Sequence, residues 1–235
     1  DTKATFGTGC FILLNTGNKG LKSRNKLITT IAYKIKNNTS YALEGSIFNS
    51  GSTMNWLKNE LKIIDDINKT ESLASSIKDN NGVYFVPAFT GLGAPHWNPD
   101  ARGTIIGLTG SSGIAEIVRA SLEAVAYQSC DLFDAMQSDG QVPKIVRVDG
   151  GMSKNDWLMQ FLANTSKKNI ERSYVTETTS QGAAILAAIA CGILPSLQEA
   201  SKLWKRSKKF SPKINKNQIK KNKNGWKKAI KKSIL

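Results

Sequence analysis

The chain has 235 residues, of which 40% are hydrophobic, enough for one large domain or two small ones with a buried core. Its net charge is +15, but residues 201–235 carry 14 Lys or Arg and no Asp or Glu, so residues 1–200 are nearly neutral. The sequence contains no apolar run of 18 residues and does not begin with a basic and then an apolar segment, so we expect neither a helical membrane span nor a signal peptide. A strand pattern that starts near residue 3, without an initiator Met, predicts a piece of a longer protein.

The numbers and spacing of cysteine and histidine limit the kinds of metal and catalytic site that the chain could contain. The three cysteines, Cys10, Cys130 and Cys191, lie far apart without CxxC spacing, which is typical of reduced core residues in a cytoplasmic protein. His96 is the only histidine, so neither a His-rich zinc site nor a Ser-His-Asp triad is expected. We therefore predict a cytoplasmic location.

A glycine-rich hairpin, ATFGTGCFILLNTG, occupies residues 4–17. It predicts a strand, a Gly-Thr-Gly turn and a second strand, and the bare backbone of such a turn can approach an anion such as phosphate. Taken alone, the pattern is more typical of an ordinary turn than of a phosphate site. Further strands at 27–33 and 41–48 predict an antiparallel start to the domain.

A helix is predicted over residues 53–64, where Trp56, Leu57, Leu61 and Ile64 share one face. The Gly-Ser turn before it is either a second phosphate or ribose contact or a plain N-cap. Residues 65–81 predict another helix and a turn.

The middle of the chain alternates short strands with a loop. Residues 83–89 predict a strand ended by proline, and 104–109 a short buried strand. Between them, residues 90–103 form a Gly- and Pro-rich loop whose fixed-geometry residues favour an ordered conformation. The long helix predicted over 113–136 is apolar on most of its surface, as a helix packed between two layers is.

Two βα units follow. The first has a strand at 144–148, a loop at 149–153, and a helix over 154–165 with Ser153 as N-cap and Asp156 at the capping-box position. The second has a strand at 169–174 and a small-residue helix at 182–190. Antiparallel strands followed by βα units predict an α/β domain with a mixed sheet and helices on both faces.

Residues 1–200 are predicted to form this domain, and residues 201–235 a basic C-terminal appendix with a docking helix. Trp226, Ala229, Ile230 and Ile234 lie on one helical face, so the last helix is expected to dock on the body with its lysines outward. The lysines form either a solvated surface or a site for nucleic acid or anionic lipid. The solvated surface is favoured, with no nucleic-acid partner and no membrane insertion.

Four segments, in order and with plausible spacing, resemble the second domain of the glycerol kinases in the FGGY carbohydrate kinase family. They are 6–17 (FGTGCFILLNTG), 41–57 (from YALEG to WL), 86–123 (from VPAFTGLGAPHW through DARG to ASLE) and 147–161 (from RVDGGM to LMQF). The resemblance runs from residue 3 to about Trp226. Related sugar kinases share the Asp-Gly-Gly segment but differ in the loop after the proline strand.

The resemblance implies a fold, the second ribonuclease H-like half of the actin, hexokinase and sugar-kinase superfamily. It also implies a reaction, in which ATP and glycerol give sn-glycerol 3-phosphate and ADP, with Mg²⁺ bound along with the nucleotide. The implied partners are glycerol, the chain's own N-terminal kinase domain and further copies of the protein in a homo-oligomer.

The resemblance also assigns nucleotide-binding residues by motif. Thr8 is expected to contact the phosphates, Gly51 and Asn55 to lie at the nucleotide, and Gly151 and Asn155 to line the adenosine part. The glycines fit this assignment because no Cβ stands between ligand and backbone, and Asn155 offers both a donor and an acceptor. The family's usual pattern has Gln where this chain has Asn55, whose shorter amide affects that one contact.

Phe11 is expected to pack its ring against the carbon side of glycerol. The resemblance places the Asp that accepts the hydroxyl proton, and the carboxylates that position the metal, upstream of the hairpin. We therefore expect no catalytic base and no metal ligand in this chain, read Asp1 as linker, and expect the chain alone to be inactive. The alternatives are a kinase for another polyol or sugar, and a non-catalytic nucleotide-binding module.

Overall fold

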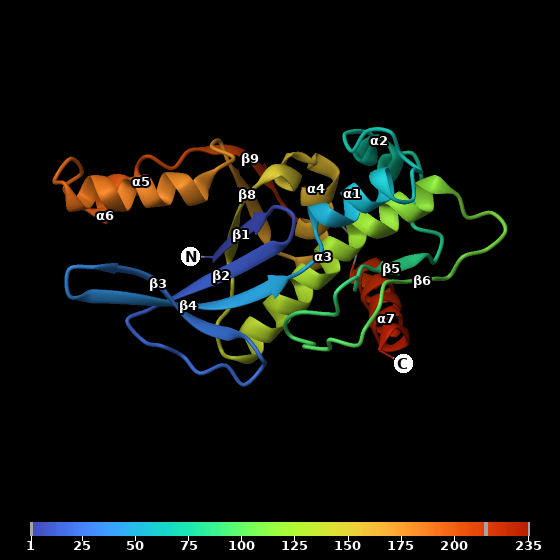
Figure 1. Cartoon of the computed structure of the whole chain (residues 1–235), viewed down its shortest axis with the longest axis horizontal. Helices are drawn as coiled ribbons and strands as arrows, with labels where there is room; N and C mark the ends of the chain where they lie inside the picture. The colour runs from blue at the N-terminus through green and yellow to red at the C-terminus, as the bar shows by residue number, and fades with distance from the viewer. Residues whose placement is uncertain (1, 214–215, 235) are drawn as a thin grey trace.

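The computed structural model describes residues 2–213 and 216–234 and has a mixed α/β architecture built on a seven-stranded sheet (Figure 1). The strand order is β3-β4-β2-β1-β7-β8-β9. The strands are β1 (Thr2–Phe6), β2 (Cys10–Gly17), β3 (Ile28–Ile35), β4 (Asn38–Ile47), β7 (Ile145–Asp149), β8 (Asn169–Ser173) and β9 (Arg206–Phe210). Strands β1, β7 and β8 are parallel and the other neighbours antiparallel, which confirms the predicted mixed sheet and its antiparallel start.

Helices lie on both faces of this sheet. They are α1 (Gly51–Asn59), α2 (Lys69–Ser75), α3 (Ile114–Ser138), α4 (Asp156–Ser166), α5 (Thr178–Ala190), α6 (Leu197–Ser201) and α7 (Lys216–Ser233). A 3₁₀ turn spans Gly151–Lys154, and β5 (Tyr84–Val86) pairs with β6 (Thr104–Ile106) in a separate two-stranded sheet.

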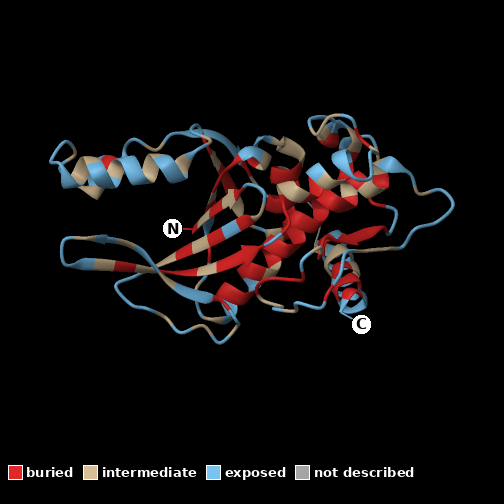
Figure 2. Ribbon diagram, in the orientation of Figure 1, coloured by how far each residue is buried: buried red, intermediate tan, exposed pale blue. Residues whose placement is uncertain are grey.

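The main core lies between the sheet and α3. Strand β1 alternates as expected, with Ala4 and Phe6 fully buried and Lys3 and Thr5 half-buried on the opposite face. Helix α3 supplies a nearly continuous buried surface and also packs on α4 (Figure 2). The long apolar helix of the sequence is therefore confirmed.

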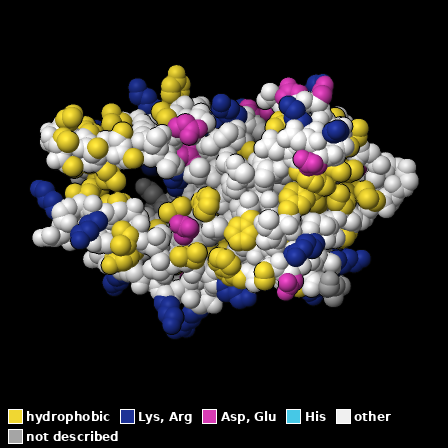
Figure 3. All heavy atoms as spheres, viewed as in Figure 1, with side chains coloured by type: hydrophobic (Ala, Val, Ile, Leu, Met, Phe, Trp, Pro, Cys, Tyr) yellow, Lys and Arg dark blue, Asp and Glu magenta, His cyan; other side chains and the backbone are white. Residues whose placement is uncertain are grey.

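Helix α5 is different, because none of its 13 residues is buried. With α6 it forms an arm that runs beside the β3–β4 hairpin, and Figure 3 shows a hollow between the two. A cavity of about 410 Å³ separates α5 from the sheet residues Lys3 and Leu13. The helix begins at Thr178, four residues before the predicted start at Gly182.

The helix predicted over 53–64 is shorter than expected. Helix α1 begins two residues earlier and ends at Asn59. Lys62 adopts a left-handed φ of 54°, which turns the chain out of the helix. Ile64 is still buried in the core, but Leu61 is exposed, so the predicted four-residue face does not form.

The strands predicted at 83–89 and 104–109 are also shorter. Strand β5 ends at Val86, because Pro87 cannot donate to a ladder and the Ala88 N–H turns back to the Val86 carbonyl at 2.9 Å. Gly107, with a φ of 82°, ends β6. Strand β6 is half-buried, so the prediction of a buried strand there is wrong.

The start of α4 differs from the predicted capping box. Asn155 is the N-cap, and its side-chain oxygen accepts a hydrogen bond from the Leu158 N–H at 2.8 Å. Ser153 instead donates to the Gly150 carbonyl at 2.7 Å and closes the 3₁₀ turn.

The carboxylate of Asp156 pairs with Arg172 at 2.8 Å rather than with a cap. Burial would raise the pKa of Asp156, but hydrogen bonds from neighbouring cations outweigh it and hold that pKa below its ordinary value.

Residues 201–235 contribute to the sheet as well as to a docked helix. Strand β9 belongs to residues 201–235 and pairs with β8, so the sheet extends across residue 200. The division of the chain into two units at that residue stays a prediction. In α7, Trp226, Ala229 and Ile230 are buried as expected. Ile234 follows the helix and is 42% exposed, so its assignment to the docking face is wrong.

Trp226 holds α7 against the body. Its ring stacks on Tyr127 at 5.4 Å, and its indole N–H donates to Asp131 at 2.8 Å. We expect Trp226→Ala to lower the free energy of unfolding by about 3–5 kcal/mol through the cavity it leaves. Urea denaturation measures this, and Trp226→Phe, which keeps most of the ring, should cost less. Equal losses in the two variants would contradict this account of the contact.

Asp139, the C-cap of α3, fastens the loop after β2. Its carboxylate accepts hydrogen bonds from Ser23 at 2.5 Å, the Arg24 N–H at 2.9 Å and Asn25 at 2.7 Å. Burial would raise the Asp139 pKa, but these donors outweigh it and hold that pKa below the usual 3.8. Stability from this group is therefore full above the unfolded pKa and is lost as pH falls through the lowered folded pKa.

The pH dependence of unfolding tests this arrangement. The parent chain should lose more stability than Asp139→Asn as pH falls below about 3.8. Chemical denaturation of the two proteins across that range measures the difference. Parallel pH curves would show that Asp139 does not contribute in this way.

Candidate nucleotide and substrate site

The turn between β1 and β2, residues 7–9, is fixed by the start of α1. The carbonyl of Gly7 accepts the Gly51 N–H at 2.9 Å, and the carbonyl of Thr8 accepts the amides of Ser50 at 2.9 Å and Ser52 at 3.0 Å. A Cβ on Gly51 would lie 2.7 Å from the Gly7 oxygen, so only glycine fits there. The Gly51 N–H is therefore used within the turn, and the assignment of Gly51 to the nucleotide stays a prediction.

Other polar groups of this region remain open to a ligand. Thr8 is exposed, and within the described residues its amide and that of Gly9 make no backbone hydrogen bond. Next to the α1 N-terminus, the buried side-chain amide nitrogen of Asn49 has no hydrogen-bond partner among the described residues. Exposed N–H groups in a glycine turn favour an anion.

The loop after β7 lies beside this turn. Gly150 adopts a φ of 84°, and a Cβ there would lie 2.4 Å from the Phe6 carbonyl oxygen. Gly151 is the opposite case: it is exposed, and a Cβ on it would meet nothing within 4 Å. The Ser50 hydroxyl lies 3.2 Å from the Met152 sulfur, so residues 7–9, 50–52 and 150–152 meet.

Two asparagines were assigned to the nucleotide. Asn155 is half-buried at the α4 N-terminus, where its oxygen serves as the helix cap and its Nδ2 lies 3.4 Å from the Thr70 hydroxyl. Its oxygen keeps one acceptor position and its Nδ2 one N–H group for a ligand, so its assignment to the adenosine part stays a prediction. Asn55 is exposed on α1, one turn after Gly51.

An exposed aromatic pair lies on the other side of the turn. Phe11 is 49% exposed and lines a hollow of about 550 Å³ together with Gly9, Phe48 and Thr90. Phe48 is 42% exposed, and its ring meets Trp97 edge-on at 6.4 Å. The sequence drew attention to Phe11 alone. The register of the strands is the signal that could have indicated Phe48. Phe11 pairs with Ser46, and Phe48, two residues after Ser46, faces the same side of the sheet as Ser46.

A charged cluster joins the end of β7 to α5. The carboxylate of Asp149 is 2% exposed, lies 3.1 Å from the Lys3 ammonium, and accepts a hydrogen bond from the Thr178 hydroxyl. Lys3 also donates to Thr179 at 3.1 Å. One Asp149 oxygen, Oδ1, is buried without a hydrogen-bond partner among the described residues.

The cysteines are poor nucleophiles where they are buried. Burial raises the pKa of the Cys10 thiol, and the nearby Asp149 charge adds to the effect. Burial likewise raises the pKa of Cys130 to about 12. Cys191 is exposed, so its assignment to the core is wrong. All three are free thiols.

A dedicated metal cage is not found in the described part of the chain, where no three His, Cys, Asp or Glu side chains are grouped to hold an ion. Among the same residues, no helix is both long and apolar enough to cross a membrane.

Comparison with known proteins identifies the family and the fold of the chain. Residues 2–191 match the C-terminal domain of the FGGY family of carbohydrate kinases. Glycerol kinase from Alteromonas mediterranea is 50% identical over 97% of this chain and 46% of its own length. Glycerol kinase from Coxiella burnetii is 47% identical over 99% of this chain and 46% of its own length. The chain thus spans about half the length of these curated relatives.

Solved structures place the fold in the same group. Plasmodium falciparum glycerol kinase, solved with ADP, superimposes with a TM-score of 0.91 at 40% identity, over 100% of this chain and 47% of that one. Gluconate kinase from Lactobacillus acidophilus gives a TM-score of 0.82 at 22% identity over 98% of this chain and 46% of its own, which shows the shared fold. The predicted fold is confirmed, and the chain belongs to the FGGY family of carbohydrate kinases, of which it carries the C-terminal domain.

Proposed function

We propose that this chain is the nucleotide-holding part of an ATP-dependent glycerol kinase, which transfers the γ-phosphate of ATP to glycerol to give sn-glycerol 3-phosphate. The observation that carries the proposal is the meeting of residues 7–9, 50–52 and 150–152 beside the exposed ring of Phe11. The solved Plasmodium falciparum glycerol kinase contains ADP, which supports nucleotide binding in the present protein.

The phosphate end of the nucleotide would lie at the Gly7–Gly9 turn. The Thr8 hydroxyl and the open amides of Thr8 and Gly9 are the donors available there. Phosphoryl transfer needs positioning and charge neutralisation more than covalent help, and a turn held rigidly by α1 provides positioning.

The adenosine end would lie against Gly151. The open space at its Cα lets a flat base and ribose rest on bare backbone. The Asn155 amide group would donate a hydrogen bond to the ligand, and Asn55 would reach from α1. The side chain of Asn55 is one methylene shorter than that of the Gln that the family usually has there.

The polyol would lie on the side of Phe11. An exposed aromatic ring complements the C–H face of a small polyol, whose hydroxyls need polar groups elsewhere. These groups and the carboxylate that accepts the hydroxyl proton would come from an N-terminal kinase domain, since the curated relatives are about twice as long. Mg²⁺ would arrive with the nucleotide phosphates and be positioned by carboxylates outside this chain, because the described residues offer no cage of their own. A homo-oligomer in the cytoplasm, where the three free thiols would stay reduced, completes the proposal.

The test is ATP-dependent phosphorylation by the longest reading frame that contains this chain. We expect turnover with glycerol, and little with xylulose or ribulose. Robust turnover of xylulose but not glycerol would favour another sugar kinase. ADP binding without turnover of any polyol would favour a non-catalytic nucleotide-binding module.

Phe11→Ala in that enzyme separates the substrate site from the nucleotide site. We expect KM for glycerol to rise about tenfold, because an apolar wall worth about 1.4 kcal/mol is lost. KM for ATP should stay unchanged, as should the values for the surface control Lys19→Gln. A change in KM for ATP alone would remove Phe11 from the polyol site.

A further inference from the structure

Helix α7 presents a face of six lysines to solvent. The buried side chains of Ile219, Trp226 and Ile230 mark the face of α7 that packs on the body. The helical repeat therefore places the six lysines on the outer side of the helix, in two rows. All six are exposed, and we name them the lysine face: Lys220, Lys227 and Lys231 in one row, and Lys221, Lys228 and Lys232 in the other. Each row is about 16 Å long. Figure 1 shows α7 at the periphery of the molecule.

The charge on this face is not compensated by ion pairs among the described residues. Helix α7 contains no acidic residue, and none of the six lysines makes an ion pair within the described residues. Lys223, nearer the body, does pair with a carboxylate, that of Asp134, at 3.0 Å. Like charges four residues apart, as in Lys227 and Lys231, destabilise a helix. The helix C-terminus accounts for Lys231 and Lys232, which lie in its last turn, but not for the others.

We propose that the lysine face binds the surface of an anionic phospholipid bilayer, without insertion. Ammonium groups on flexible stems are point charges that suit phosphate headgroups spread over a surface. The face contains no Arg for bidentate contacts to base edges, and its only aromatic residue in α7, Trp226, is buried and cannot stack on a base. A layer of headgroups therefore fits it better than a nucleic acid. The proposal does not depend on the kinase activity.

Vesicle co-sedimentation of the whole chain tests it. The probe is a phosphatidylcholine vesicle with about one-quarter phosphatidylglycerol, against pure phosphatidylcholine. We expect binding to the anionic vesicles only, weakening as salt is added. Changing all six lysines of the face to Gln should lower the partition coefficient at least about a hundredfold, because each lysine near such a surface contributes about fivefold.

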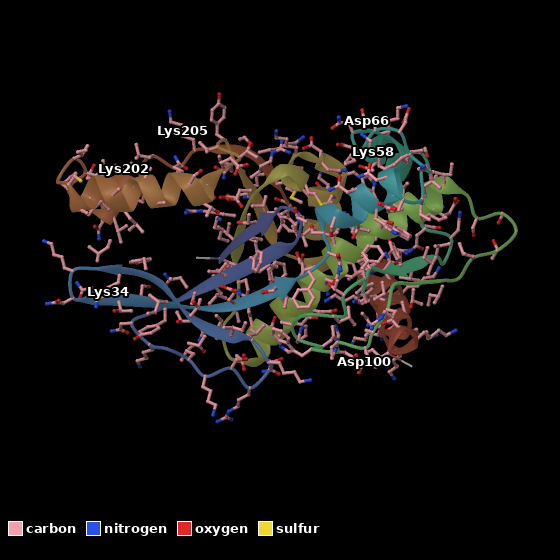
Figure 4. All side chains as sticks on the ribbon, viewed as in Figure 1. Lys34, Lys58, Asp66, Asp100, Lys202 and Lys205 are labelled. Atoms are coloured by element: carbon pink, nitrogen blue, oxygen red, sulfur yellow. The ribbon has the colours of Figure 1, made fainter. Side chains whose placement is uncertain are left out.

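A charge-matched control separates the face from net charge. It changes six exposed lysines of the body to Gln: Lys19, Lys22, Lys34, Lys36, Lys58 and Lys78. Lys34 and Lys58, labelled in Figure 4, lie away from α7. This control should keep most of the binding, and circular dichroism should show both variants folded.

Three outcomes would overturn the proposal. They are absence of binding of the parent chain to anionic vesicles, an equal loss in the two variants, and preferential binding of a single-stranded oligonucleotide that depends on the lysine face while vesicle binding does not. The last outcome would make the partner a nucleic acid.

Discussion

A Gly151→Trp variant is expected to lose ADP binding by at least about tenfold, or 1.4 kcal/mol, while it keeps the unfolding free energy of the parent chain. Gly151 is exposed, and a Cβ on it would meet no heavy atom within 4 Å, so the indole can be accommodated by the fold. It would fill the space proposed for adenosine. Calorimetric titration with ADP and urea denaturation give the two readouts.

The matched control at this position is Gly151→Ala, whose single methyl should change ADP affinity little. Unchanged affinity in the Trp variant would remove adenosine from Gly151. A loss of stability in the Trp variant would instead mean that the loop is packed more tightly than the structure shows.

Gly150→Ala is expected to lower the free energy of unfolding by about 3 kcal/mol. Two costs add here, a φ of 84° that disfavours any Cβ and a contact of 2.4 Å with the Phe6 carbonyl oxygen. Gly140 isolates the first cost, because it has a φ of 80° and nothing within 4 Å of a Cβ.

Gly140→Ala should therefore cost only about 1 kcal/mol. Urea denaturation measures the unfolding free energy of both variants. We attribute the difference between their losses to the contact of residue 150 with β1. Equal losses in the two variants would show that this contact gives way easily.

Local sequence patterns predicted the elements whose structure is locally determined. The alternation in β1 and the long apolar surface of α3 are confirmed, because the order of apolar and polar residues along each element determines which of its sides is buried. Gly9 and Gly150 were also found this way, because a Cβ at either position would collide with neighbouring backbone.

Features that depend on distant contacts could not be predicted. The N-cap of α4 moved to Asn155 because Gly150 packs on Phe6 and forces a 3₁₀ turn first. Phe48 was missed because the ring that it meets, Trp97, is far away in the sequence. The partner of the Gly51 N–H could not be predicted either, because the Gly7 carbonyl that accepts it lies in another segment.

Hydrogen bonds fasten the start of α5 to residues 149 and 150, which directly precede Gly151. Gly150 donates its N–H to the Thr176 carbonyl at 3.1 Å, and the preceding Asp149 accepts from Thr178 at the first turn of α5. Because no residue of α5 is buried, these bonds and those of Lys3 attach the first turn of α5 to the sheet. The orientation of the arm is therefore coupled to the backbone beside Gly151, where we propose that adenosine binds.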